Sequence, residues 1–233
     1  DSPYSMRSIG EHLAARGLMV VALRLPGHGT APSGLVSFKV EDMQAAVRVG
    51  MRDLRRQVGP DRPIYMVGYS NGAALAVDYT LSVVDGADLP RPAGLVLLSP
   101  AIGISRLAVV ARMRTGISSL PGFGRAAWQQ IVQEFDPYKY SSFSFNAAGQ
   151  TQRLTSGLAS RVERLARNRP IEGFPPVLAF QSTVDSTVRA EAVVDALLEH
   201  LAPGHHELVL FDVNRLAGAR IPGPNHPAGG FGA

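Results

Sequence analysis

The sequence predicts an α/β fold: a doubly wound, mostly parallel sheet with a helical cap inserted between two of its strands. Short apolar runs without alternation, typical of strands covered on both faces, follow amphipathic segments at helical spacing. This rhythm stops once, over residues 101–174, and then resumes. With 233 residues, 45% apolar and 18% charged, the chain has the composition of one globular domain with an insertion.

The first helix is expected over residues 3–16. Ser2 and Pro3 form an N-cap followed by a proline at the first helical position, and Gly17 ends the segment. Leu18 to Leu23 is a continuous apolar run, which predicts a buried strand directly after the helix.

The same helix-then-strand unit recurs along the chain. Apolar residues at helical spacing predict a second helix that ends at Gly59 and Pro60. The expected elements that follow are a strand at 64–67, a helix at 71–84, a strand at 94–98, a strand at 177–180, a helix at 187–201 and a strand at 207–211. We therefore expect an α/β core from residues 1–100 and 175–215, with five strands.

The interruption at 101–174 is interpreted as a cap over the carboxyl edge of the sheet, where open α/β sheets bind ligands. Helical pieces are expected near 105–115 and 150–168. Seven of the sixteen aromatic residues fall in a 23-residue stretch of it: Phe123, Trp128, Phe135, Tyr138, Tyr140, Phe143 and Phe145. They either contact substrate or form the cap's own small core. Residues 216–233, rich in glycine, alanine and proline, are expected to form a flexible tail.

Composition narrows the classes of partner. There is no cysteine, which excludes disulfides, thiolate metal sites and a cysteine nucleophile, and leaves the compartment open, with cytoplasm as the default. No apolar run is long enough for a membrane span, so the chain as written is expected to be soluble. The net charge of +4 comes from scattered arginines, interpreted as solvated helix faces, with weak attraction to an anionic surface or to nucleic acid as the alternatives. No aromatic-flanked basic motif for nucleic acid occurs, so no nucleic-acid partner is predicted.

The segment Gly68-Tyr69-Ser70-Asn71-Gly72 is the strongest chemical signal. It lies between an expected strand and an expected helix, which is the context that gives a G-x-S-x-G pattern its meaning. Glycines permit a tight turn with a strained central residue, which presents the hydroxyl of Ser70 above the sheet. The backbone N–H of Asn71 would then donate to a developing oxyanion. An ordinary Ser-Asn-Gly turn is the alternative.

Leu25-Pro26-Gly27-His28-Gly29-Thr30, after an expected strand, resembles the conserved turn of esterases and lipases of the α/β-hydrolase fold. The resemblance extends to about residue 213, and includes the monoacylglycerol-lipase-like hydrolases. It implies a serine esterase with no cofactor or metal, acting on a small-molecule ester or lipid. It also implies that His28 ties its loop by hydrogen bonds and is not part of the catalytic triad.

A serine nucleophile in this fold is followed along the chain by an acid and then by a histidine. Asp185 fits the acid position, because it follows the strand at 177–180 through a short loop; a turn or helix cap is its other interpretation, and Asp212 is the competing acid. His226 alone of the histidines lies beyond the last strand, so it is the candidate base, although its glycine- and proline-rich surroundings depart from the family pattern. His205 and His206 precede that strand and are expected at the wrong edge of the sheet.

Relatives begin with further strands and a His-Gly loop whose backbone N–H is the second oxyanion donor. This sequence opens at Asp1-Ser2-Pro3, which resembles the residues just after that loop, so we expect the donor to be missing as written. Loss of one oxyanion donor costs about a hundred- to a thousandfold in rate. We also expect exposed strand edges to promote poor solubility or dimer pairing.

The function expected is hydrolysis of carboxylic esters with an apolar acyl chain, through Ser70, Asp185 and His226. One alternative is a thioesterase, amidase or acyltransferase on the same triad. Another is a catalytically incomplete fragment, or a non-catalytic binding protein that uses the pocket under the cap. The sequence does not indicate the oligomeric state.

Overall fold

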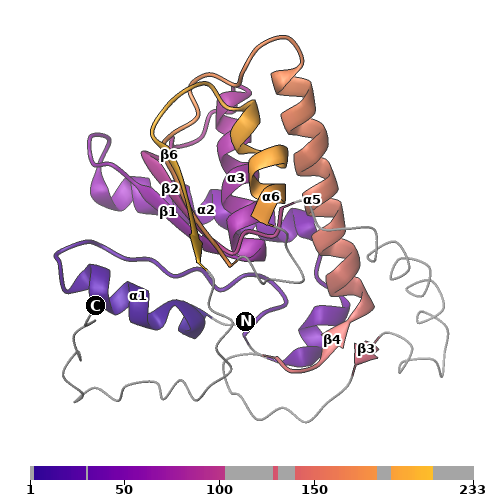
Figure 1. Cartoon of the computed structure of the whole chain (residues 1–233). Helices are drawn as coiled ribbons and strands as arrows, with labels where there is room; N and C mark the ends of the chain where they lie inside the picture. Colours follow the sequence, from indigo (N-terminus) through magenta and orange to yellow (C-terminus); the bar gives the residue numbers. More distant parts are fainter. Residues whose placement is uncertain (1–2, 30, 103–127, 131–139, 183–189, 212–233) are drawn as a thin grey trace, which may run out of the picture.

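A four-stranded parallel sheet forms the centre of the molecule, in a computed structural model that describes residues 3–29, 31–102, 128–130, 140–182 and 190–211 (Figure 1). The strand order is β1-β2-β5-β6. The strands are β1 (Tyr65–Tyr69), β2 (Gly94–Leu98), β5 (Val177–Ser182) and β6 (His206–Phe211). All three pairings are parallel, as expected for strands joined by helices.

Helices alternate with these strands where the apolar spacing predicts them. They are η1 (Pro3–Met6), α1 (Arg7–Ala14), η2 (Pro32–Val36), α2 (Val40–Val58), α3 (Asn71–Val84), α5 (Phe145–Ala166), α6 (Ala190–Ala196) and η4 (Leu198–His200). A short antiparallel pair, β3 (Trp128–Gln130) and β4 (Phe143–Ser144), precedes α5. Among all the residues that the structure describes, no helix is both long and apolar enough to cross a lipid bilayer.

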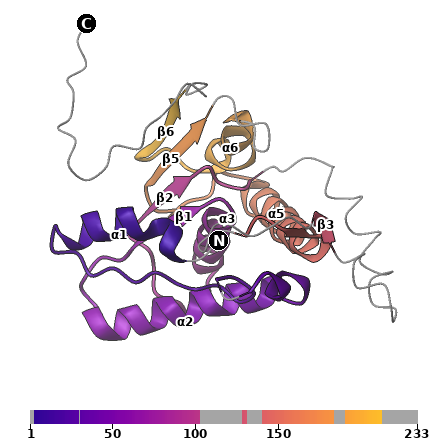
Figure 2. The same ribbon diagram turned by 90° about the horizontal axis from the view of Figure 1, so that it is seen from below.

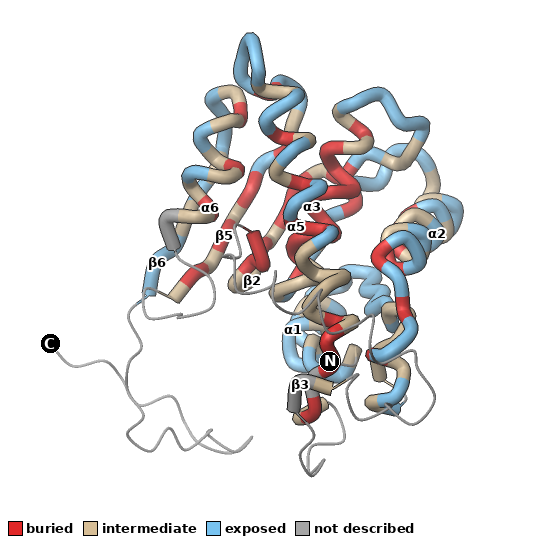
Figure 3. Tube along the Cα trace, turned by 90° about the vertical axis from the view of Figure 1, so that its right-hand side faces the viewer, coloured by how far each residue is buried: buried red, intermediate tan, exposed pale blue. Residues whose placement is uncertain are grey.

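Helix α3 is the centre of the core. It contacts β1 and β2 on one side and α2 and α5 on the others, so side chains all round it are buried. Figure 3 shows the buried residues gathered on α3 and on the middle strands β2 and β5. Figure 2 shows α3, α5 and α6 on one face of the sheet, with α1 on the other side of β1. An apolar α3 therefore positions the residue at its N-terminus rigidly against the sheet.

The expected buried strand at Leu18 to Leu23 is the clearest error of the sequence interpretation. The segment is assigned to no strand, and its large apolar side chains are 38–55% exposed. Its two faces do meet helices: a methyl group added at Gly10 of α1 would lie 3.5 Å from Val20, and one at Gly50 of α2 would lie 2.7 Å from Leu23. A strand also needs a neighbour to complete its ladder, and none of the described strands pairs with this segment.

The insertion between β2 and β5 is only partly described. Its second half holds α5, which packs against α3 and buries Leu154, Leu158 and Val162 in the shared core. Trp128 and Tyr140 are partly buried against that core. Phe123, Phe135, Tyr138 and the helical piece near 105–115 lie outside the described residues, so the cap boundary at 101–174 stays a prediction.

Candidate active site

Ser70 occupies a strained turn between β1 and α3. Its φ of 51° and ψ of −115° place a non-glycine residue at positive φ, which costs about 1–3 kcal/mol and persists only where surrounding structure enforces it. The residue is half-buried, directly after the last residue of β1 and directly before the first of α3. The structure therefore has the strand-turn-helix geometry that the glycine-serine pattern predicts.

Gly68 makes this turn possible by letting strand and helix approach closely. A methyl group added there would lie 2.5 Å from Ala73 Cα and 2.6 Å from Ala73 N, both backbone atoms that cannot move aside. Gly72 differs, because a methyl group at that position would meet nothing within 4 Å. Of the two glycines in the motif, only Gly68 is required by close packing in the described part of the chain.

Backbone hydrogen bonds hold Ser70 from both sides. Its N–H donates to the Leu98 carbonyl at the end of β2, at 2.9 Å. Its carbonyl accepts from the Ala73 N–H at 3.1 Å, the Ala74 N–H at 3.3 Å and the Ala101 N–H at 3.1 Å. The turn is thus tied to the neighbouring strand as well as to its own helix, which fixes the backbone of Ser70.

Asn71 begins α3, so its backbone N–H belongs to the first turn, where no intrahelical acceptor exists. Its side-chain Nδ2 lies 3.7 Å from the sulfur of Met43 on α2, and its buried Oδ1 has no hydrogen-bond partner among the described residues. The N–H suits the oxyanion role predicted for it. The side-chain anchor on Met43 has no signal in the sequence, because it depends on how α2 packs against α3.

The turn containing His28 is locked by its own contacts. The His28 Nδ1 donates to the Pro26 carbonyl at 2.9 Å, and the ring meets Phe38 edge-on at 5.2 Å between centroids. Burial lowers the pKa of His28, only partly offset by the bond to Pro26, which favours the neutral form of the ring. His28 therefore ties its loop by a hydrogen bond, as expected from the resemblance.

The loop after this turn is joined to the start of α5, a connection that the sequence did not reveal. Ser144 Oγ donates to the Leu35 carbonyl at 2.7 Å and accepts from the Ala147 N–H at 3.0 Å as the helix N-cap. Asn146 Nδ2 donates to the carbonyls of Leu35 and Phe38, each at 3.0 Å. The middle of the insertion, at the start of α5, is thus fastened to the His28 region across more than 100 residues of chain.

The predicted acid and base are not placed. Asp185, Asp212 and His226 lie outside the described residues, so their roles stay predictions. The strand that leads to Asp185, β5, ends at Ser182 and lies beside β2, which in turn lies beside β1. His206 is the first residue of β6 and His205 precedes it, so both lie at the edge of the parallel sheet opposite Ser70, as expected.

Comparison with known proteins covers nearly the whole chain. Residues 4–213 match the family described as Hydrolase_4, serine aminopeptidase, S33. No curated protein gave a match. Several solved structures are similar in fold. The three described next are each at most 21% identical in sequence to this chain.

One belongs to a report on LipS and LipT, two metagenome-derived lipolytic enzymes: TM-score 0.70, 21% identity, covering 91% of this chain and 79% of that one. A second is a monoacylglycerol lipase of Paleococcus ferrophilus: TM-score 0.65, 18% identity, covering 91% and 80%. A third is a soluble variant of monoglyceride lipase from Saccharomyces cerevisiae in complex with a substrate analog: TM-score 0.67, 12% identity, covering 91% and 74%. At these identities the likeness establishes the fold and leaves the substrate open.

Proposed function

Because this chain belongs to the Hydrolase_4 (serine aminopeptidase, S33) family, we propose that it is a serine hydrolase that cleaves carboxylic esters with an apolar acyl chain. Membership of this family and the similar solved structures confirm the α/β-hydrolase fold. The observation that carries the proposal is the strained, half-buried Ser70 between β1 and α3. Strain of this kind gathers at functional sites, where it presents a reacting side chain.

In the proposed reaction, Ser70 Oγ attacks the acyl carbon while His226 takes its proton. Asp185 accepts a hydrogen bond from the other nitrogen of His226 and so holds the imidazole in the tautomer that can act as base. The C–O bond to the alcohol then breaks, and the alcohol leaves with the proton from His226. Water, deprotonated by the same histidine, hydrolyses the acyl-enzyme and regenerates Ser70.

The negative charge that develops on the carbonyl oxygen needs donors fixed in advance. The Asn71 N–H at the N-terminus of α3 supplies one, assisted by the positive end of the helix dipole. Backbone bonds to β2 hold that first turn in place, so the donor need not reorganise during the reaction. This arrangement supports acyl transfer to and from a serine.

An apolar acyl chain is favoured by two features. The insertion is rich in aromatic residues. Two of those that the structure describes, Trp128 and Tyr140, have partly exposed side chains. Lipolytic and monoacylglycerol lipase enzymes share this fold. Amide hydrolysis is the second candidate, because the matched family is described as a serine aminopeptidase.

Matched ester, thioester and amide substrates with one medium-length acyl chain would separate these activities. We expect the ester to have the highest kcat/KM, and Ser70→Ala to lower kcat by about 10⁴-fold or more. Asp185→Asn and His226→Ala should each lower kcat at least about a hundredfold, whereas the control variants Asp212→Asn and His205→Ala should not. A faster amide than ester, or full activity in Ser70→Ala, would contradict the proposal.

A further inference from the structure

The second half of α2 carries a concentration of positive charge. Over Arg48–Gln57 the helix has four arginines and one acidic residue, Asp53. We call the four side chains Arg48, Arg52, Arg55 and Arg56 the α2 arginine face. Arg56 pairs with Asp53 at 2.9 Å, but Arg48 and Arg52 make no ion pair with any described residue.

Hydrogen bonds to backbone carbonyls tie together the surface around these arginines. Arg55 Nη1 donates to the carbonyls of Gly59, Pro60 and Arg62 at 2.7–2.9 Å, which are neutral acceptors and leave its charge uncompensated. Tyr79 Oη donates to the Pro90 carbonyl at 2.8 Å and so fixes Pro90 beside the helix.

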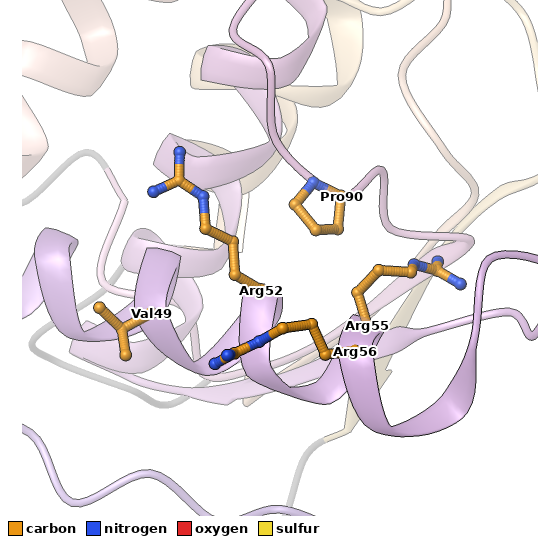
Figure 4. A pocket seen from close by; sticks show the side chains of 5 residues that line it. All are labelled: Val49, Arg52, Arg55, Arg56 and Pro90. Atoms are coloured by element: carbon orange, nitrogen blue, oxygen red, sulfur yellow. The ribbon is translucent and has the colours of Figure 1, made fainter.

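A shallow groove of about 440 Å³ lies on this surface, lined by Val49, Arg52, Arg55, Arg56 and Pro90 (Figure 4). Burial raises the pKa of the Tyr79 hydroxyl to about 12, and the charges of Arg52, Arg55 and Arg48 oppose that rise.

The α2 arginine face is separate from the Ser70 site. The C-terminal end of α2 leads through a short loop to the start of β1, whereas Ser70 follows the other end of that strand. The groove therefore lies toward the opposite edge of the sheet. Figure 2 shows α2 lengthwise along one side of the molecule, with its outer face open.

We propose that the α2 arginine face binds the anionic headgroups of a lipid surface. Unpaired guanidinium groups bind phosphate strongly, and basic side chains gathered on one surface attract anionic membranes. Val49, which lines the groove, is 64% exposed, and with Pro90 it gives the surface an apolar part suited to the headgroup region. The groove is lined by no aromatic side chain on which a base could stack, so nucleic acid fits it less well.

This surface binding goes beyond the proposed ester hydrolysis and does not depend on it. Binding needs neither Ser70 nor an intact triad, so it can be measured in the Ser70→Ala variant. Each basic residue near an anionic membrane strengthens binding about fivefold, and removal of two should weaken it about thirtyfold.

The test is co-sedimentation of the whole 233-residue chain, carrying Ser70→Ala, with phosphatidylglycerol–phosphatidylcholine vesicles and with phosphatidylcholine vesicles. We expect binding to the anionic vesicles only, weakening as salt rises. Arg48→Gln with Arg52→Gln should weaken it about thirtyfold. The matched control is Arg153→Gln with Arg164→Gln, which removes the same charge from arginines already paired with Glu41 and Asp85, and should change binding only slightly.

Circular dichroism of both variants verifies that they are folded. Equal loss in the two double variants would show a general effect of net charge and overturn the proposal. Absence of binding to anionic vesicles at low salt would overturn it too. Tighter binding of duplex DNA than of anionic vesicles at the same salt would assign the surface to nucleic acid instead.

Discussion

Gly68 shows how a single residue can decide whether the turn at Ser70 forms. Ala at this position places a methyl group 2.5 Å from the backbone of Ala73, so β1 and α3 must separate. We expect Gly68→Ala to lower the free energy of unfolding by about 1–3 kcal/mol or more, the range for overpacking in a core. Chemical denaturation measures the change.

Gly72→Ala is the matched control from the same motif. A methyl group there meets no atom of the described residues within 4 Å, and alanine is favoured over glycine within a helix. We expect this variant to be unchanged or more stable by about 0.5–1 kcal/mol. Equal destabilisation of the two variants would mean that the close approach at Gly68 is not what shapes the turn.

At the scale of elements, Asp78 joins three helices. This α3 carboxylate is 5% exposed; it accepts from Gln44 Nε2 of α2 at 2.8 Å and from Arg161 Nη1 of α5 at 3.2 Å. Arg161 also donates to Ser82 Oγ at 2.6 Å. The helix that begins beside Ser70 is thus tied to both helices that pack against it.

Removal of Arg161 should leave a buried carboxylate without its charge partner. We expect Arg161→Met to cost about 3–5 kcal/mol of unfolding free energy, and Asp78→Leu combined with Arg161→Met to recover much of that loss. Arg164→Met, which breaks the more exposed pair with Asp85, should cost less than about 1 kcal/mol. Urea denaturation of the three variants measures these changes. Equal losses of stability in Arg161→Met and Arg164→Met would contradict this account.

Elements set by local patterns could be predicted well, and those set by distant partners could not. The helix at 71–84 and the strand at 94–98 have the predicted bounds, because an apolar run beside glycine or serine is a local signal. Leu18 to Leu23 reads as a buried strand because its composition suits contact on both faces, but composition does not reveal whether a neighbouring strand completes the ladder.

The candidate site divides in the same way. The strand-turn-helix geometry at Gly68, Ser70 and Asn71 could be predicted from one motif, since the turn is built from adjacent residues. The bond of Asn71 to Met43 and the fastening of Ser144 to Leu35 could not, because they join segments far apart in the sequence.

For the whole molecule, the described sheet ends at an exposed apolar strand. On β1, Tyr65 is 61% exposed, Val67 37% and Tyr69 45%, and no described strand pairs with its outer edge. Open apolar edges promote pairing between chains. We expect the 233-residue chain to self-associate in light scattering, and Val67→Lys to reduce this.

Val36→Lys is the control for the added charge, because Val36 is also 37% exposed but lies in η2, away from the sheet edge. It should leave self-association unchanged. A monodisperse monomer of the unaltered chain would contradict the expectation, as would an equal effect of both lysine variants.

The central claim is that Ser70 is an activated nucleophile, and labelling with a fluorophosphonate probe tests it most directly. The probe reacts only with an activated serine and requires no assumption about substrate. The account predicts that the chain is labelled and that Ser70→Ala abolishes the labelling. A folded chain that takes up no probe, or a Ser70→Ala variant that is labelled as strongly as the unaltered chain, would contradict it.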